Sequence, residues 1–316
     1  MSRWSLGLSL LCLVAASVGL CAGPSGWMPP WQAVQRLVDG DVIVASLRAP
    51  RVALAALVGA SLGLAGAVMQ TLLRNDLADP YVLGLSGGAS VGAVISLLLL
   101  PAAPPGLLAA FGAGATAILV RGLAGAPYDR TRLLLAGVTL SSLLTSLTGL
   151  LLILAPEDRL LRSASFWLFG GMGTPRWPLL AVPASLLVLS FSWLVPRAER
   201  LDRLTMGDDV ATSLGVDVTR TQRFVLVWAV ALTASAVAVG GLVGFVGLIA
   251  PHAARRLVGA PHRAMLPATV LLGAALVMAA DTVARTAFAP RELPVGLVTA
   301  GLGGPFFLSL LRKEAT

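Results

Sequence analysis

Apolar segments long enough to cross a membrane alternate with short polar junctions along almost the whole chain. A helix needs about 20 apolar residues to span the hydrocarbon core of a bilayer, and a window of about that length finds candidate spans. The window predicts ten spans, with the eighth the weakest, at residues 5–23, 51–73, 82–100, 106–124, 132–154, 178–196, 223–241, 245–258, 265–284 and 295–312. The pattern therefore predicts an all-α polytopic membrane protein of about ten transmembrane helices, formed as a single transmembrane domain over residues 1–316.

The first apolar segment has two interpretations. Arg3 followed by the run from Leu6 to Ala22 is similar to a secretory signal peptide. The run has about 17 residues, longer than the usual core of about 7 to 15, and Leu20 before Cys21 does not fit a lipoprotein cleavage site. We therefore favour a retained first span over a signal peptide.

The order of the spans predicts an internal repeat. Spans two to five and spans seven to ten form two groups of four, and the alternating direction of the chain makes the two groups enter the membrane from opposite faces. Inverted repeats of this kind are common in transporters. The prediction of inverted four-helix repeats depends on this topology alone.

Composition supports the membrane assignment and excludes nucleic acid as a partner. The chain is 57% hydrophobic and 12% charged, whereas soluble proteins are roughly 25% charged. Lys313 is the sole lysine among 23 basic residues, so the net charge of +8 comes from arginines spread through short loops. No basic patch or tail of the kind that binds nucleic acid is present in the sequence.

The distribution of basic residues predicts the orientation. With both termini in the cytoplasm, fifteen basic residues lie inside and eight outside, which agrees with the positive-inside rule. The outside set is Arg36, Arg48, Arg51, Arg159, Arg162, Arg176, Arg285 and Arg291. Arg48 and Arg51 at the outer mouth of the second span, with Arg285 and Arg291 on the same side, are unexpected there, because insertion does not favour basic residues at that end.

The sequence lacks the residues of an internal energy source or a chemical centre. A P-loop needs a lysine on the phosphates, and Lys313 lies at the end of the chain, so we expect no ATPase site, no catalytic site and no cofactor. Asp281 is the one acid well inside a predicted span. Arg285 follows it by four residues, so the two predict a structural ion pair, with a gating or docking role as the alternative.

Cysteines, histidines and hydroxyl side chains give no reactive or metal-binding pattern. Cys12 and Cys21 lie nine residues apart on one helix, too far to form a disulfide. His252 and His262 lie ten residues apart in basic surroundings, which favours interfacial positions over metal ligation. The Ser-rich segment at 139–149 predicts helix packing through small residues.

The longest polar run between two spans covers residues 206–223 and begins MGDDVATSLG. Gly207 followed by Asp208 and Asp209 predicts the start of a short helix, because acids complement the positive end of the helix dipole, and Gly215 predicts its end. Such a helix suits the groove of a partner protein. An ordinary capped loop is an equally good interpretation of the pattern alone.

Six blocks of residues, in order from about 47 to 312, resemble the FecCD family of permeases, which serve bacterial ABC importers of iron-siderophores, haem and cobalamin. The blocks are LRAPRVALAALVGASLGLAGAVMQTLLRNDLADPYVLGLSGGASVG (47–92), RLLLAGVTLSS (132–142), FWLFGGM (166–172), MGDDVATSLGVDV (206–218), GFVGLIAPHAARRLVGAPHR (244–263) and ADTVARTAFAPRELPVGLVTAGLGGPFF (280–307). The chain departs from the usual pattern where Asp76 replaces a proline and where no proline precedes GFVG. The match is specific for the family and not for the substrate.

The resemblance implies a fold, partners and site residues. It implies the type II ABC importer permease fold in the bacterial inner membrane, a homodimer with the translocation path between its subunits, two ATPase subunits below and a periplasmic binding protein above. The cytoplasmic loop at about 197–222 would hold the coupling helix. The residues that the family pattern assigns to ATPase coupling are Gly207, Asp208, Asp209, Leu214 and Gly215. Those assigned to docking of an acidic binding protein are Arg48, Arg51 and Arg285, which we expect to be exposed.

The substrate expected from the resemblance is a ferric siderophore, with haem and cobalamin as alternatives. Two other classes remain open at this point. An ion-coupled secondary carrier would use Asp281 as its buried acid, and a membrane scaffold would transport nothing.

Overall fold

The computed structural model describes residues 3–23, 26–100, 102–125, 129–173 and 175–314, and a helix lies at each of the ten predicted spans. These helices are α1 (Arg3–Cys21), α3 (Ala49–Leu73), α4 (Leu85–Leu99), α5 (Pro105–Leu123), α6 (Arg130–Ile153), α8 (Ala181–Leu194), α11 (Val218–Gly240), α12 (Val246–Val258), α13 (His262–Thr286) and α14 (Val295–Glu314). The predicted all-α membrane fold is therefore confirmed.

Seven helical segments of the described residues are long and apolar enough to cross a membrane. Helix α4 and the apolar part of α14, Val295–Ser309, are shorter. Helix α12 has 13 residues, which agrees with the weak pattern of the eighth predicted span. These short helices lie among longer neighbours, since α4 packs against α5 and α6 and α12 packs against α13 and α3.

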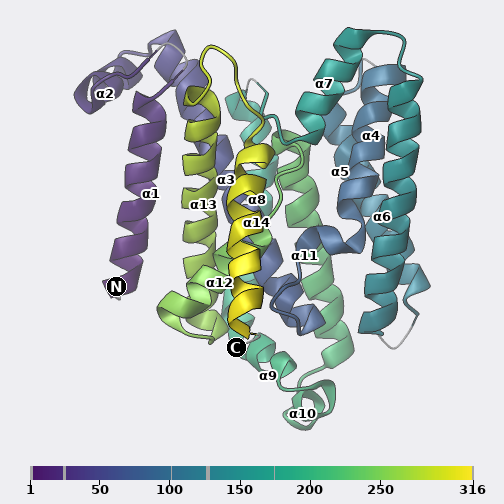
Figure 1. Ribbon diagram of the computed structural model, residues 1–316. Coiled ribbons are helices and arrows are strands. Elements are labelled where there is room, and N and C mark those ends of the chain that lie inside the picture. Colours follow the sequence, from purple (N-terminus) through teal and green to yellow (C-terminus); the bar gives the residue numbers. More distant parts are fainter. Residues whose placement is uncertain (1–2, 24–25, 101, 126–128, 174, 315–316) are drawn as a thin grey trace.

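Short helices mark the two ends of the bundle (Figure 1). Helices α2 (Pro30–Val38) and α7 (Asp158–Leu168) lie at one end, which we call the α2 face. Helices α9 (Ala198–Thr205) and α10 (Asp208–Ser213) lie at the other, the α10 face, together with the beginning of α1 and the end of α14. The remaining short elements are η1 (Val42–Arg48), η2 (Pro80–Leu83), η3 (Trp177–Leu180) and η4 (Val195–Arg197).

Helix α3 is the central helix of the bundle. In the segment that includes it, 83% of the most apolar window is buried, and it packs against α13, α11 and α12. Glycines allow this close approach: a Cβ atom on Gly59 would lie 2.0 Å from the carbonyl oxygen of Gly273, and one on Gly66 would lie 1.9 Å from that of Gly247. Small residues at such crossings let helix backbones pack tightly where no water drives association.

The two groups of four helices enter from opposite faces. Helix α3 begins next to η1 at the α2 face and ends at the α10 face, where Arg74, its C-cap, contacts Asp208 of α10. Helix α11 starts at the α10 face, directly after α10. The direction predicted for inverted four-helix repeats is thus present in the structure.

Helix α6 packs through its Ser-rich segment on one side, as predicted: it contacts α4, where a Cβ atom on Gly87 would lie 3.1 Å from the carbonyl oxygen of Ser141. Its other side is exposed. Only 11% of its most apolar window is buried within the chain. The hydroxyls of Ser142 and Ser146 donate to the carbonyl oxygens four residues earlier, at 3.0 Å in both cases, and both residues are exposed. The single chain therefore presents a hydroxyl-bearing face of a membrane-length helix to its surroundings.

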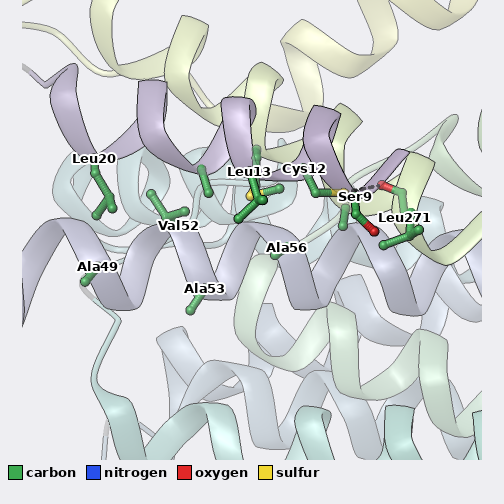
Figure 2. A pocket seen from close by; sticks show the side chains of 12 residues that line it. Ser9, Cys12, Leu13, Leu20, Ala49, Val52, Ala53, Ala56 and Leu271 are labelled. Carbon is green, nitrogen blue, oxygen red and sulfur yellow. Dashed lines mark hydrogen bonds between the residues drawn. The ribbon is translucent and has the colours of Figure 1, made fainter. Parts of the chain in front are cut away.

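Helix α1 is part of the bundle. It packs against α13 and α3, and the Sγ atom of Cys12 donates to the carbonyl oxygen of Leu271 in α13 at 3.2 Å. An apolar groove of about 540 Å³ lies between the three helices, lined by side chains such as Leu13, Val52 and Ala56 (Figure 2). These contacts agree with the retained first span favoured above.

Candidate functional site

Helix α10 stands between two glycines with positive φ angles. Gly207 has φ of 126° and forms the N-cap, and Gly215 has φ of 80° and follows the helix. The amide of Gly215 donates to the carbonyl oxygen of Thr212 at 2.9 Å, and the amide of Val216 donates to that of Ala211 at 2.9 Å. These bonds satisfy carbonyls at the end of the helix. The predicted helix limits are confirmed.

The carboxylate of Asp208 joins the start of α10 to three membrane helices. Its Oδ1 atom accepts from Nη2 of Arg74 at 2.5 Å and from Nη2 of Arg130 at 2.8 Å, and its Oδ2 atom accepts from Arg130 at 3.0 Å. Nε2 of Gln222 in α11 donates to the same Oδ1 at 3.3 Å. Arg74 also donates from Nε to the carbonyl oxygen of Leu204 in α9 at 2.8 Å. Asp208 therefore faces its own chain.

Arg74 and Arg130 carry like charges around one carboxylate. Partial burial and the positive charge of Arg130 lower the pKa of Arg74 from its ordinary value, and Asp208 and Asp209 act in the opposite direction. The guanidinium group stays charged at neutral pH because its ordinary pKa is so high. The sequence did not predict this cluster, since Arg74 and Arg130 lie 134 and 78 residues from Asp208.

Exposed apolar side chains lie on α10 and at its two ends. Met206, just before the N-cap, Val210 within the helix and Leu214, the C-cap, are 63%, 44% and 48% exposed. We call these three residues the α10 stripe. Ala211 is fully buried, and Asp209 is exposed. Of the stripe, the family pattern indicated only Leu214; Met206 and Val210 were not predicted.

A second polar cluster joins α9 to α13 and α3. The ring of His262, only 4% exposed, lies between Oδ1 of Asp202, 2.5 Å from Nδ1, and Oγ1 of Thr71, 2.6 Å from Nε2. The backbone amide of His262 also donates to Asp202 at 3.0 Å. This position at the α10 face agrees with the interfacial position predicted for His262. Its partners lie 60 and 191 residues away along the chain, too far for the sequence pattern to indicate them.

At the α2 face, Asp281 lies between two arginines. Its Oδ2 atom is 2.9 Å from Nε of Arg285, which is the predicted ion pair, and its Oδ1 atom is 3.0 Å from Nε of Arg51, which was not predicted. Arg51 also pairs with Glu292, from Nη1 to Oε2, at 2.9 Å. The acid is 1% exposed. A carboxylate held by two guanidinium groups suits a structural ion pair.

Two arginines of this face bind the end of α1. Arg48 donates from Nη1 to the carbonyl oxygens of Leu20 and Cys21, at 2.9 Å each. Arg285 donates to those of Ala22 at 3.3 Å and Gly19 at 3.2 Å. Cations there satisfy helix-terminal carbonyls and complement the negative end of the helix dipole.

The expected exposure of Arg48, Arg51 and Arg285 is wrong for the single chain. They are 5%, 8% and 3% exposed, because α1 and the segment that carries Glu292 cover them. Sequence spacing could not reveal this cover. The five exposed arginines at this face are Arg36, Arg159, Arg162, Arg176 and Arg291.

Other polar residues singled out above have structural partners. Asp76 lies 3.3 Å from Nη2 of Arg255 and ties its loop to α12. The rings of His252 and Phe306 pack edge to face, with their centres 5.6 Å apart. Among the described residues, no group of three or more His, Cys, Asp or Glu could hold a metal ion.

Comparisons with known proteins agree on one family. The family model described as the FecCD transport family matches residues 9–313. The chain is 43% identical to the "Cobalamin import system permease protein BtuC" of Halobacterium salinarum, covering 87% of this chain and 74% of that protein. It is 39% identical to the "Hemin transport system permease protein HmuU" of Yersinia pestis, covering 99% and 96%. It is 37% identical to the "Probable siderophore transport system permease protein YfhA" of Bacillus subtilis, covering 98% and 95%.

A solved structure has the same fold. It is an inward-facing conformation of a metal-chelate type ABC transporter, 30% identical, with a TM-score of 0.86 over 98% of this chain and 99% of that one.

Proposed function

Because the chain belongs to the FecCD transport family, as a permease of the metal-chelate type of ABC importer, we propose that it moves a ferric siderophore into the cytoplasm with energy from a separate ATPase. The α10 stripe carries this proposal. It is an exposed apolar surface on a short helix whose other side is fixed to the chain, which is the form that a partner's groove can bind.

The residues of α10 divide into two roles. Leu214, with Met206 and Val210, enters a cleft of the ATPase, and Asp209 faces the same partner. Asp208 holds α10 to the ends of α3 and α6, so that movement of the ATPase reaches the membrane helices. Gly207 and Gly215 set the position of the helix between its neighbours.

The charge distribution supports a cytoplasmic α10 face. Both described ends of the chain lie on this face (Figure 1), and the count of fifteen basic residues against eight favours it as the inside. The membrane is the inner membrane of a bacterium, with N- and C-termini in the cytoplasm.

The α2 face receives the substrate-binding protein. Arg48, Arg51 and Arg285 form its buried basic centre, and exposed arginines such as Arg291 surround it. Glu292, with its side chain 33% exposed, pairs with Arg51 at the edge of this centre. An acidic side chain of the binding protein replaces Glu292 at Arg51 during docking, which gives charge complementarity without exposing the ion pair below.

The hydroxyl-bearing face of α6 supports a second copy of the chain. Ser142 and Ser146 are exposed on a helix that is 11% buried, and polar groups inside a membrane face other protein or water rather than lipid. A homodimer with α6 at its centre gives these hydroxyls a translocation path. A polar, loosely lined path suits a bulky metal chelate.

The choice of substrate and energy source has alternatives. The relatives named above include cobalamin and hemin permeases, so those two cargoes remain alternatives to a siderophore. A secondary carrier driven through Asp281 is disfavoured, because this acid is 1% exposed and held by two arginines. A carrier needs an acid that exchanges its ion with water.

Gentle purification from the native membrane, followed by mass spectrometry of bound proteins, tests the proposal. We expect an ATPase subunit to co-purify with the chain and to be lost when Met206, Val210 and Leu214 are replaced by serine. The matched control is T212A, an exposed α10 residue outside the stripe. A co-purifying binding protein identifies the cargo by its bound ligand. Absence of any ATPase from a folded, dimeric sample contradicts the proposal.

A further inference from the structure

A pocket of about 320 Å³ opens at the α10 face, between the end of α8 and the start of α11. Three arginines line it: Arg197 from η4, Arg200 from α9 and Arg220 from α11. Trp193 and Phe224 also line it, from the two membrane-length helices. Gly215, which follows α10, also lines the pocket, but the function proposed above gives no role to its arginines and aromatic residues.

Aromatic rings hold two of the arginines in place. The guanidinium carbon of Arg197 lies 4.5 Å from the centre of the Trp193 ring, and Nη1 of Arg197 donates to the carbonyl oxygen of Trp193 at 2.9 Å. The guanidinium carbon of Arg220 lies 5.9 Å from the centre of the Phe224 ring, and the two rings are 5.4 Å apart. The four side chains form a row in the order Arg197, Trp193, Phe224 and Arg220. Cation–π contacts within this row orient both charged groups.

The pocket keeps a net positive charge among the described residues, since it is lined by three arginines and one carboxylate, that of Asp217. No described carboxylate lies within 4.0 Å of a guanidinium nitrogen of Arg197, Arg200 or Arg220, whereas other arginines at this face, such as Arg74, have ion pairs. Asp217 lines the pocket, but its Oδ1 atom accepts from the backbone amide of Arg220 at 2.9 Å. Arginines arranged in this way suit the oxygens of a phosphate.

The position of the pocket indicates which phosphate it binds. It lies where two membrane helices end, and exposed apolar side chains continue from it along them, Val188 and Leu189 on α8 and Val227 on α11. Basic pockets between membrane helices at the cytoplasmic surface bind anionic lipid headgroups. We propose that this pocket binds the phosphate of an anionic phospholipid, whose acyl chains lie along α8 and α11.

Lipid retention in nanodiscs of phosphatidylcholine with a small fraction of phosphatidylglycerol, measured by native mass spectrometry, tests the proposal. We expect R197Q/R220Q to bind phosphatidylglycerol at least about tenfold more weakly than the unchanged chain. Each basic residue near an anionic membrane surface contributes on the order of a fivefold change in affinity. R256Q/R263Q removes the same charge from two other exposed arginines of α12 and α13, and we expect it to stay within about twofold of the unchanged chain. R200Q provides a variant without ring contacts should the double variant fail to fold, and we expect it to weaken binding as well.

Three results would overturn the assignment. Equal loss in R197Q/R220Q and R256Q/R263Q would show a diffuse effect of surface charge. If inorganic phosphate in lipid-free detergent stabilised the chain against heat as much as phosphatidylglycerol does, the pocket would be a site for free phosphate. Unchanged lipid retention in R197Q/R220Q or R200Q, with weaker ATPase co-purification, would make it a contact for an acidic protein segment. Each result concerns binding at this pocket and leaves the transport proposal unaffected.

Discussion

Oδ1 of Asp208 lies 2.5 Å from Nη2 of Arg74, the residue that ends α3. The same oxygen lies 2.8 Å from Nη2 of Arg130, the first residue of α6. Of the seven membrane-length segments among the described residues, one carboxylate at the start of α10 therefore joins the most buried to the least buried. A displacement of α10 by an ATPase would move the ends of α3 and α6 together.

The first prediction concerns this contact. D208N removes the charge that both arginines face, and hydrogen bonds to charged groups contribute about 1.5–3 kcal/mol. We expect uptake to fall about tenfold or more, because 1.4 kcal/mol corresponds to a factor of ten. Binding of the ATPase should remain, since the α10 stripe is unchanged. Uptake and ATPase co-purification, measured on the same membranes, separate the two effects.

D209N is the control for D208N. Asp209 is its exposed neighbour on the same helix, so the variant removes the same charge without touching Arg74 or Arg130. Because Asp209 faces the ATPase, any fall in uptake by D209N should be matched by a fall in ATPase co-purification, whereas D208N lowers uptake alone. A loss of uptake in D209N with full ATPase co-purification, equal to that in D208N, would refute a specific role for Asp208.

The second prediction concerns the ion pairs at the α2 face. D281N leaves Arg51 and Arg285 buried without their shared charge, so we expect a loss of about 3 kcal/mol in the free energy of unfolding. E292Q removes a charge whose side chain is 33% exposed, and its effect should stay below about 1 kcal/mol. Thermal unfolding in detergent compares the two. Similar midpoints would contradict a structural role for Asp281.

The third prediction separates docking from stability at this face. E292Q frees Arg51 for an acidic partner, so we expect the binding protein to bind the permease several times more tightly. R291Q, at the exposed neighbour of Glu292, should weaken binding modestly and slow association. Surface plasmon resonance with the permease in nanodiscs measures both. Weaker binding by E292Q would argue against exchange of Glu292 for an acidic partner.

The fold could be predicted largely from the sequence, and the site only in part. Ten apolar segments determine the spans, because each must satisfy its backbone hydrogen bonds as a helix in lipid. Helices α2 and α7 were not predicted, since they are short amphipathic segments outside any span. The limits of α10 followed from Gly207 and Gly215. The fold alone brought distant partners together, as with His262 and Asp202, 60 residues apart.

Burial was the other limit. We expected Arg48 and Arg285 to be exposed, because basic residues at a membrane surface usually are exposed. Their burial depends on the last turn of α1, whose free carbonyls they bind. A window of hydropathy contains no information on which helix end meets which side chain.

The fourth prediction concerns the hydroxyl-bearing face of α6. In a C12A/C21A background, S142C and S146C should react with a membrane-impermeant maleimide, because a translocation path holds water. V188C, on the exposed apolar side of α8, should stay unlabelled in lipid. Labelling is read by mass shift in reconstituted vesicles. Protection of both α6 positions, with labelling at V188C, would remove α6 from the path.

The central claim is that ATP hydrolysis by a partner bound at α10 drives uptake. The measurement is uptake of a ferric siderophore into proteoliposomes that contain the chain, its ATPase and its binding protein, with ATP inside or outside and with or without a proton uncoupler. The account predicts uptake that requires ATP on the α10 side, persists with the uncoupler and is lost when the α10 stripe is replaced by serine. Uptake that collapses with the uncoupler while ATP is constant, or that survives loss of the stripe, would contradict it.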